Sequence, residues 1–315
     1  MHPALSVILF TTASGMGYGL LVWLAVFNLA GVLPATRGFG AAALVLALGL
    51  ITAGLLASTA HLGNPQRAWR ALTQWRTSWL SREGVVSLAV YPFALTFAGG
   101  WVLLGRTDGA FALAGALAAA LALLTLVCTA QIYASLKPIP AWRNAWTVPN
   151  YLGLGLSSGA GALLALLALG GHDPRAAAAV TLLATGVALV LKLAYWRHVD
   201  AHPGTLTPAD AIGVTRFGTV RTLDPPHTQA NYVQREMGFA VARKHAARLR
   251  QVALAGAFGA PALAALACLA LPGVAGTVAA VAALPLLGAG LLTERWLLFA
   301  QARHLVTLYY GATRA

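Results

Sequence analysis

Eight apolar segments, each about 20 residues or more in length, occupy most of this 315-residue chain. A helix needs about 20 apolar residues to cross the hydrocarbon core of a bilayer. Because lipid offers no hydrogen bonds to the backbone, apolar segments of this length must be helical. The sequence therefore predicts an all-α integral membrane protein, a bundle of eight transmembrane helices at residues 6–33, 40–62, 84–104, 110–135, 148–170, 174–199, 251–271 and 275–302.

Composition supports the membrane assignment and excludes a soluble protein. Hydrophobic residues make up 59% of the chain and charged residues 9%, against roughly 45–50% and 25% in soluble domains. A formal net charge of +13 would suggest nucleic-acid binding in a soluble protein, but in a membrane protein basic residues collect in cytoplasmic loops. We therefore expect no nucleic-acid partner and a single membrane domain in the inner (cytoplasmic) membrane.

Basic residues collect on one side of the predicted bundle. Most of the 21 Lys and Arg residues lie in segments 64–83, 136–147 and 197–250 and in the C-terminal tail. The positive-inside rule then predicts that both termini and all the long loops are cytoplasmic. Alternatively, this basic face docks an acidic partner, on whichever side of the membrane it lies. The 197–250 loop is too long to be only a connector.

Ionisable residues within or beside the predicted spans share one level, on the side of the long loops. Such residues are costly in a membrane and are functional by default; here they are His61, Glu83, Lys192, Arg197, His198, Glu294, Arg295 and His304. A transporter usually carries polar groups near the midplane and shows paired halves, which we do not find. The one-sided arrangement favours a site open to the lipid and to one aqueous side, as a quinone would require.

His61 and Glu83 are the side chains best suited to exchange protons with a quinone, because both titrate at accessible pH. Each also has a structural alternative. His61 could cap its helix, and Glu83 could form an ion pair with Arg67 or Arg82.

The other buried charges have structural interpretations. Glu294 and Arg295 are adjacent and could form a structural pair, and Lys192 could extend to the membrane interface. The two cysteines, Cys128 and Cys268, are too few for an iron–sulfur cluster with four thiolate ligands. No pairing of histidines is compelling for haem. We expect no metal in this chain.

Two neighbouring motifs carry a family resemblance: residues 61–70 (HLGNPQRAWR) and residues 78–84 (SWLSREG). With residues 11–17, residues 231–239 and the eight-span plan, they resemble the membrane anchor subunits of the dimethyl sulfoxide reductase family over essentially the whole chain. The resemblance implies a three-subunit oxidoreductase. A catalytic subunit would carry a molybdenum bis-pterin cofactor, a second subunit would carry iron–sulfur clusters, and the anchor would exchange electrons with ubiquinone or menaquinone.

The resemblance also implies roles for residues. In this family a His at the position of His61 and a Glu at the position of Glu83 are implicated in quinol binding and oxidation, so these two are the candidate catalytic residues. The expected quinone-binding residues are His61, Arg67, Trp69, Trp79, Arg82 and Glu83. Segments 64–83 and 197–250 are expected to dock the iron–sulfur subunit.

The family has two branches that run in opposite directions. Dimethyl sulfoxide reductases oxidise menaquinol and face the periplasm, whereas complexes similar to the cytoplasmic sulfite dehydrogenase oxidise sulfite and reduce quinone. The basic bias of the long loops favours the sulfite-oxidising branch. A menaquinol-oxidising anchor is the alternative, and a secondary transporter or a purely structural anchor is a more distant one.

Overall fold

The computed structural model describes residues 3–315 except 61, 63, 203, 205, 216–219, 221, 222, 224–228, 230–240 and 272. Within these residues the chain is helical and contains no strand, and eight helices are long and apolar enough to cross a membrane. This confirms the predicted all-α membrane architecture. Seven of the spans are α1 (Leu5–Leu29), α2 (Arg37–Thr59), α3 (Trp79–Ala98) continued by the π-helical turn η2 (Gly99–Leu104), α4 (Gly109–Ala134), α5 (Thr147–Leu169), α6 (Arg175–Ala201) and α11 (Val274–Ala300).

The remaining span is interrupted in its helical geometry. This span, Lys244–Ala270, begins within α9 (Val241–Ala253) and continues through a π-helical turn η3 (Leu254–Gly259) and α10 (Ala260–Ala270). Shorter elements lie outside the spans: the 3₁₀ helix η1 (Pro65–Gln74), α7 (Pro208–Ile212) and the 3₁₀ helix η4 (Leu305–Tyr310).

Helix boundaries differ from the apolar segments where local chemistry overrides hydropathy. The first helix ends at Leu29 rather than near residue 33, because Gly31 takes a left-handed conformation (φ 68°) and Pro34 follows. The third helix begins at Trp79, five residues before the predicted apolar segment. Its polar first turns therefore belong to the helix, and this places Glu83 on the bundle rather than in a loop.

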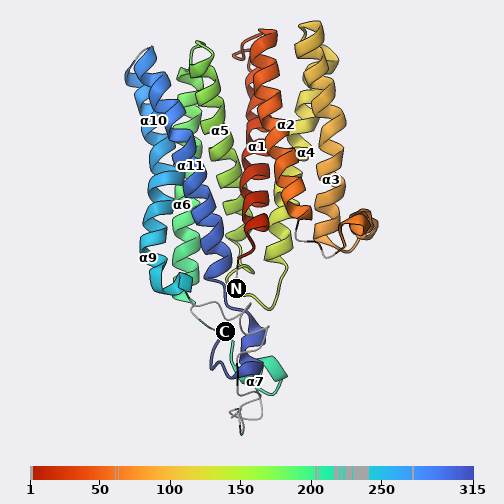
Figure 1. Ribbon diagram of the computed structural model, residues 1–315, viewed down its shortest axis with the longest axis vertical. Coiled ribbons are helices and arrows are strands. Elements are labelled where there is room, and N and C mark those ends of the chain that lie inside the picture. Colours follow the sequence, from red (N-terminus) through yellow and green to blue (C-terminus); the bar gives the residue numbers. More distant parts are fainter. Residues whose placement is uncertain are drawn as a thin grey trace.

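The bundle has two distinct ends (Figure 1). Both described ends of the chain, η1, α7 and residues 135–146 lie at one end, which we call the loop end. The short connections at residues 30–36, 105–108 and 170–174 lie at the other, which we call the turn end. Near the centre, α1 contacts α2, α4 and α5, while α10 and α11 pack beside α5 and α6. By contrast, α2 and α3 make little direct contact with each other.

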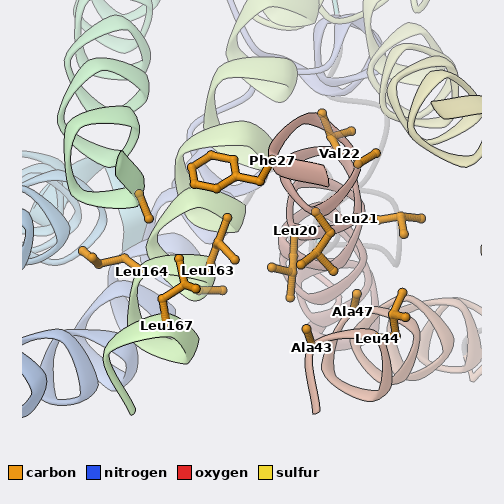
Figure 2. Packing of buried hydrophobic residues seen from close by; sticks show 14 of the residues in the cluster. Leu20, Leu21, Val22, Phe27, Ala43, Leu44, Ala47, Leu163, Leu164 and Leu167 are labelled. Atoms are coloured by element: carbon orange, nitrogen blue, oxygen red, sulfur yellow. The ribbon is translucent and has the colours of Figure 1, made fainter. Parts of the chain in front are cut away.

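Helices α1 and α5 form the core of the bundle. Figure 2 shows Phe27 of α1 extending toward α5, which carries Leu163, while Ala43 and Ala47 of α2 lie on another side of α1. The apolar part of α5 is 78% buried, more than that of any other span. Hydrophobic burial alone cannot distinguish protein from lipid, so close packing decides which helices associate.

Glycines permit α1 and α5 to approach until their backbones touch. A Cβ atom added to Gly19 would lie 1.9 Å from the carbonyl oxygen of Gly155, and one added to Gly159 would lie 2.1 Å from the carbonyl carbon of Gly19. No side chain fits at these positions without separating the helices. By contrast, Gly49 on α2 has nothing within 4 Å of an added Cβ.

Gly19→Ala should therefore lower the midpoint of thermal unfolding in detergent, because overpacking costs about 1–3 kcal/mol. Gly49→Ala is the matched control, since the same methyl group meets open space there. Equal midpoints for the two variants would contradict the close α1–α5 contact.

The C-terminal segment closes onto residues after α6. Leu206 and Ala315 exchange two backbone hydrogen bonds of 3.1 and 3.0 Å. At the start of η4, the His304 ring nitrogen Nδ1 accepts a hydrogen bond from the backbone N–H of Val306 at 2.9 Å. Burial lowers the pKa of His304 below its usual value, so the neutral ring that can accept this bond is favoured.

The order of η4 should therefore depend on pH. His304 binds its proton more tightly when the segment is unfolded than when η4 is folded. The stability of folded η4 is therefore intact above the ordinary histidine pKa of about 6.5 and declines as the pH falls below that value. Amide hydrogen exchange at Val306 should accelerate from pH 7.5 to pH 5.5, after correction for the intrinsic exchange rate. His304→Asn keeps a neutral acceptor and should abolish this pH dependence.

Candidate functional site

Glu83 is a buried carboxyl group in the first turns of α3, at the loop end of the bundle. Its residue is only 4% exposed, and its side chain accepts a hydrogen bond from the Thr129 hydroxyl of α4. Tyr18 of α1, which is also buried, lies within electrostatic reach of the carboxyl. Three helices therefore surround this group inside a largely apolar bundle.

The Thr129 hydroxyl can serve Glu83 in either protonation state. It has one hydrogen, and two acceptors lie within reach: Glu83 Oε1 and the Thr125 carbonyl oxygen, which is 3.0 Å away. When the carboxyl group is ionised, the hydroxyl donates to it. When the carboxyl group is protonated, it can donate to the Thr129 hydroxyl, which then donates to the Thr125 carbonyl oxygen. This geometry suits a group that gains and loses a proton.

Arg82 holds the loop before α3 instead of pairing with Glu83. Its guanidinium donates hydrogen bonds to the carbonyl oxygens of Trp75 and Arg76, at 2.9 and 2.7 Å, and it lies 4.3 Å from the ring centroid of Trp79. Gly84 completes the junction, because a Cβ atom there would lie 2.8 Å from the Leu72 side chain of η1. Within the described residues, no ion pair joins Glu83 to Arg67 or Arg82.

The other predicted site residues lie on the outer side of this junction. Arg67 is exposed, Trp69 is 62% exposed, and Trp79 is half-buried. His61 lies outside the described residues, as does the 231–239 motif. Of the predicted site residues that the structure describes, Glu83 alone points into the bundle, while Arg82 and Trp79 join η1 to the start of α3.

A second buried cluster joins α6 to α11. Lys192 Nζ donates to Glu294 Oε1, and Arg295 Nε lies 2.7 Å from Glu294 Oε2. All three residues are at most 3% exposed. The ion pair expected between Glu294 and Arg295 is present. The interpretation of Lys192 as a side chain that extends to the interface is wrong, because its ammonium group is buried against Glu294.

A small cavity separates this cluster from the Glu83 site. Its volume is about 20 Å³, and its lining includes Thr129, Tyr151 and Arg295. The Arg295 guanidinium lies 4.1 Å from the centroid of the Tyr151 ring. Arg295 of the cluster and Thr129, the hydrogen-bond partner of Glu83, thus border the same cavity within about three helical turns of the loop end.

Sequence reasoning missed Thr129, Tyr151 and the bond between Lys192 and Glu294. The residues of that bond are 102 positions apart, and their meeting depends on helix packing and rotation, which hydropathy does not report. Within the described residues, no group of three or more His, Cys, Asp or Glu side chains could hold a metal ion.

The fold and the site define a multi-span membrane protein that gathers its buried ionisable residues near one end of the bundle. The chain belongs to the DMSO reductase anchor subunit family, whose model matches residues 1–305. Its sequence is 37% identical to a sulfite dehydrogenase subunit of Allochromatium vinosum over 332 aligned positions, which cover 98% of this chain and 99% of the relative. Family membership makes the chain a non-catalytic anchor subunit of an oxidoreductase complex, as the sequence motifs indicated.

Removing the Arg82 guanidinium should loosen η1 without unfolding the bundle. Arg82→Gln loses the bonds to Trp75 and Arg76, so amide exchange or proteolysis within residues 65–77 should accelerate severalfold. Arg70→Gln is the control, because Arg70 lies over the Trp69 ring at 5.7 Å on an exposed surface. Equal exchange in both variants would show that Arg82 does not hold the loop.

Proposed function

We propose that this chain is the quinone-binding membrane anchor of a molybdenum and iron–sulfur oxidoreductase, and that the complex oxidises sulfite and reduces quinone. The observation that carries the proposal is the buried Glu83 carboxyl, which lies beside the Thr129 hydroxyl at the loop end. A buried carboxyl group is energetically costly in a membrane bundle and is therefore expected to be functional. Proton exchange is a function that suits it. The similarity to a sulfite dehydrogenase subunit supports the direction.

The quinone site would lie where α2 ends and α3 begins, next to η1. Helices α2 and α3 make little direct contact, and a lipid-soluble headgroup would enter between them from the bilayer. His61 would hydrogen-bond a headgroup oxygen and exchange its proton, and Glu83 would exchange the second proton. Trp69 and Trp79 would form walls of the site.

Arg67 and Arg82 would act at the edge of this site. Arg67 is exposed and free to reach a headgroup oxygen or an incoming partner. Arg82 would orient the site through the loop, because its guanidinium is bonded to the Trp75 and Arg76 carbonyl oxygens. The quinone supplies the two-electron, two-proton chemistry, and these residues bind it and move its protons.

Electrons would pass between this site and an iron–sulfur subunit docked on segments 64–83 and 197–250, and from there to the molybdenum subunit. The loop end would face the cytoplasm, because basic residues are retained on that side of the inner membrane. The exposed Trp69 and Trp75, 62% and 52% exposed, suit burial against such a partner.

The test is sulfite-dependent reduction of a ubiquinone analogue by the purified three-subunit complex. Glu83→Gln and His61→Leu should each reduce turnover at least about tenfold with assembly intact, because positioned acid–base groups contribute factors of 10²–10⁴. Asp108→Asn, at the turn end, should leave turnover unchanged, since its exposed carboxylate pairs with Arg106 at 3.1 Å and lies at the opposite end of the bundle from Glu83.

Two results would contradict parts of this proposal. Activity with dimethyl sulfoxide and menaquinol, but not with sulfite, would keep the quinone site and reverse the direction of electron flow. Full sulfite activity in both the Glu83→Gln and the His61→Leu complexes would remove the quinone site from this part of the chain and leave a structural anchor.

A further inference from the structure

The cavity between Thr129 and Arg295 is lined by both polar and apolar side chains and is large enough for a water molecule. Its volume of about 20 Å³ exceeds the 10–15 Å³ that a water requires. Hydroxyl-bearing residues of three helices line it: Thr11, Thr12 and Ser14 of α1, Thr129 of α4, and Tyr151 and Ser158 of α5. An apolar cavity of this size would remain dry, but this one offers several donors and acceptors.

Three polar atoms at this cavity are not fully hydrogen-bonded. The Tyr151 hydroxyl and the Arg295 guanidinium interact with each other, but among the described residues Thr12 Oγ1, Tyr151 Oη and Arg295 Nη1 are buried and make no hydrogen bond of good geometry. Arg295 is 3% exposed, so its unpaired N–H is costly unless something in the cavity accepts from it. A water needs two to four polar partners, and these atoms together with Thr129 provide them.

The net charge of the buried cluster of Lys192, Glu294 and Arg295 also bears on the cavity. Lys192 and Arg295 bring two positive charges and Glu294 brings one negative charge, so the cluster carries a net positive charge inside the bundle. Among the described residues, Glu83 is the other buried carboxyl group. The rings of Tyr133 and Tyr151 lie within electrostatic reach of both Glu83 and Arg295. The two tyrosine rings thus lie between the positively charged cluster and the Glu83 carboxyl.

We propose that a buried water between Thr129 and Arg295 is the proton-exchange partner of Glu83, and that Arg295 is the residue that positions it. Glu294 holds the Arg295 guanidinium, and Lys192 holds Glu294. This inference rests on the proposed function, because it describes how the carboxyl of the quinone site regains its proton.

The proton steps balance without any electron transfer. After Glu83 gives its proton to a quinone oxygen, the Thr129 hydroxyl donates its hydrogen to the carboxylate and takes one from the water. The positive guanidinium of Arg295 stabilises the negative charge that develops on the water. The water then regains a proton from the aqueous phase at the loop end, which is about two helical turns from Thr12.

Two variants of the purified complex test this relay. Thr129→Val removes the hydroxyl and keeps the shape of the side chain. Arg295→Gln removes the guanidinium and leaves Lys192 and Glu294 as a neutral pair. Both should lower kcat at least about tenfold and leave the KM for the quinone analogue within about twofold. A small weak acid such as acetic acid should restore part of the lost turnover by delivering protons directly.

Thr181→Val is the matched control. Thr181 is a fully buried threonine near the turn-end start of α6, and its hydroxyl makes no hydrogen bond among the described residues. It should match the wild type in kcat, KM and thermal midpoint. Wild-type kcat in Thr129→Val or Arg295→Gln would overturn the relay. A loss of kcat that accompanies a lowered thermal midpoint and is not restored by acetic acid would show a structural role for these residues. That result would also overturn the relay.

A readout independent of turnover is the water itself. An experimental density map of the complex at water-resolving resolution should show an ordered water within hydrogen-bond distance of Thr129 and Arg295, and this water should be absent in Arg295→Gln. A dry cavity in the wild-type complex would overturn the inference. Failure of the proposed quinone site can be distinguished from failure of the water relay. If the quinone site is wrong, the Glu83→Gln complex itself would retain full sulfite activity.

Discussion

The close approach of α1 and α5 through Gly19, Gly155 and Gly159 determines where everything else in this bundle lies. In a membrane, van der Waals contact replaces the hydrophobic effect as the force between helices. Once these two backbones touch, the hydroxyl residues near the start of α1 face the polar residues near the start of α5. The cavity is therefore a consequence of helix packing, and α4 and α11 complete it with Thr129 and Arg295.

A bundle of this kind tolerates ionisable residues only where each has a partner. Glu83 has the Thr129 hydroxyl, and Glu294 has both Lys192 and Arg295. A buried ion pair contributes little net stability, because desolvation offsets most of the attraction. One residue from each group, Thr129 and Arg295, borders the same cavity, and this is the arrangement that the proposed proton relay uses.

Hydropathy was sufficient to predict the eight spans, because their length is imposed by the bilayer. It could not place Glu83 within α3, since Ser81, Arg82 and Glu83 are polar and only the structure shows them as helical turns. The partners of Lys192 and Glu83 were also beyond sequence reasoning. Each helical residue turns the side chain by about 100°, so a cross-helix contact depends on rotations that no single segment reveals. The 61–84 motif, in contrast, identified the family directly.

The concentration of buried charge at the loop end also determines how the site responds to voltage. Glu83, Glu294 and Arg295 lie within about three helical turns of one aqueous phase, and Lys192 lies at a similar depth. The apolar remainder of the bundle, toward the turn end, is the insulating layer across which most of the membrane potential falls. Moving a charge through the whole potential changes its free energy by about 2.3 kcal/mol per 100 mV. A proton that reaches Glu83 from the loop end crosses only a small part of that field, so its binding is nearly independent of whether the membrane is energised.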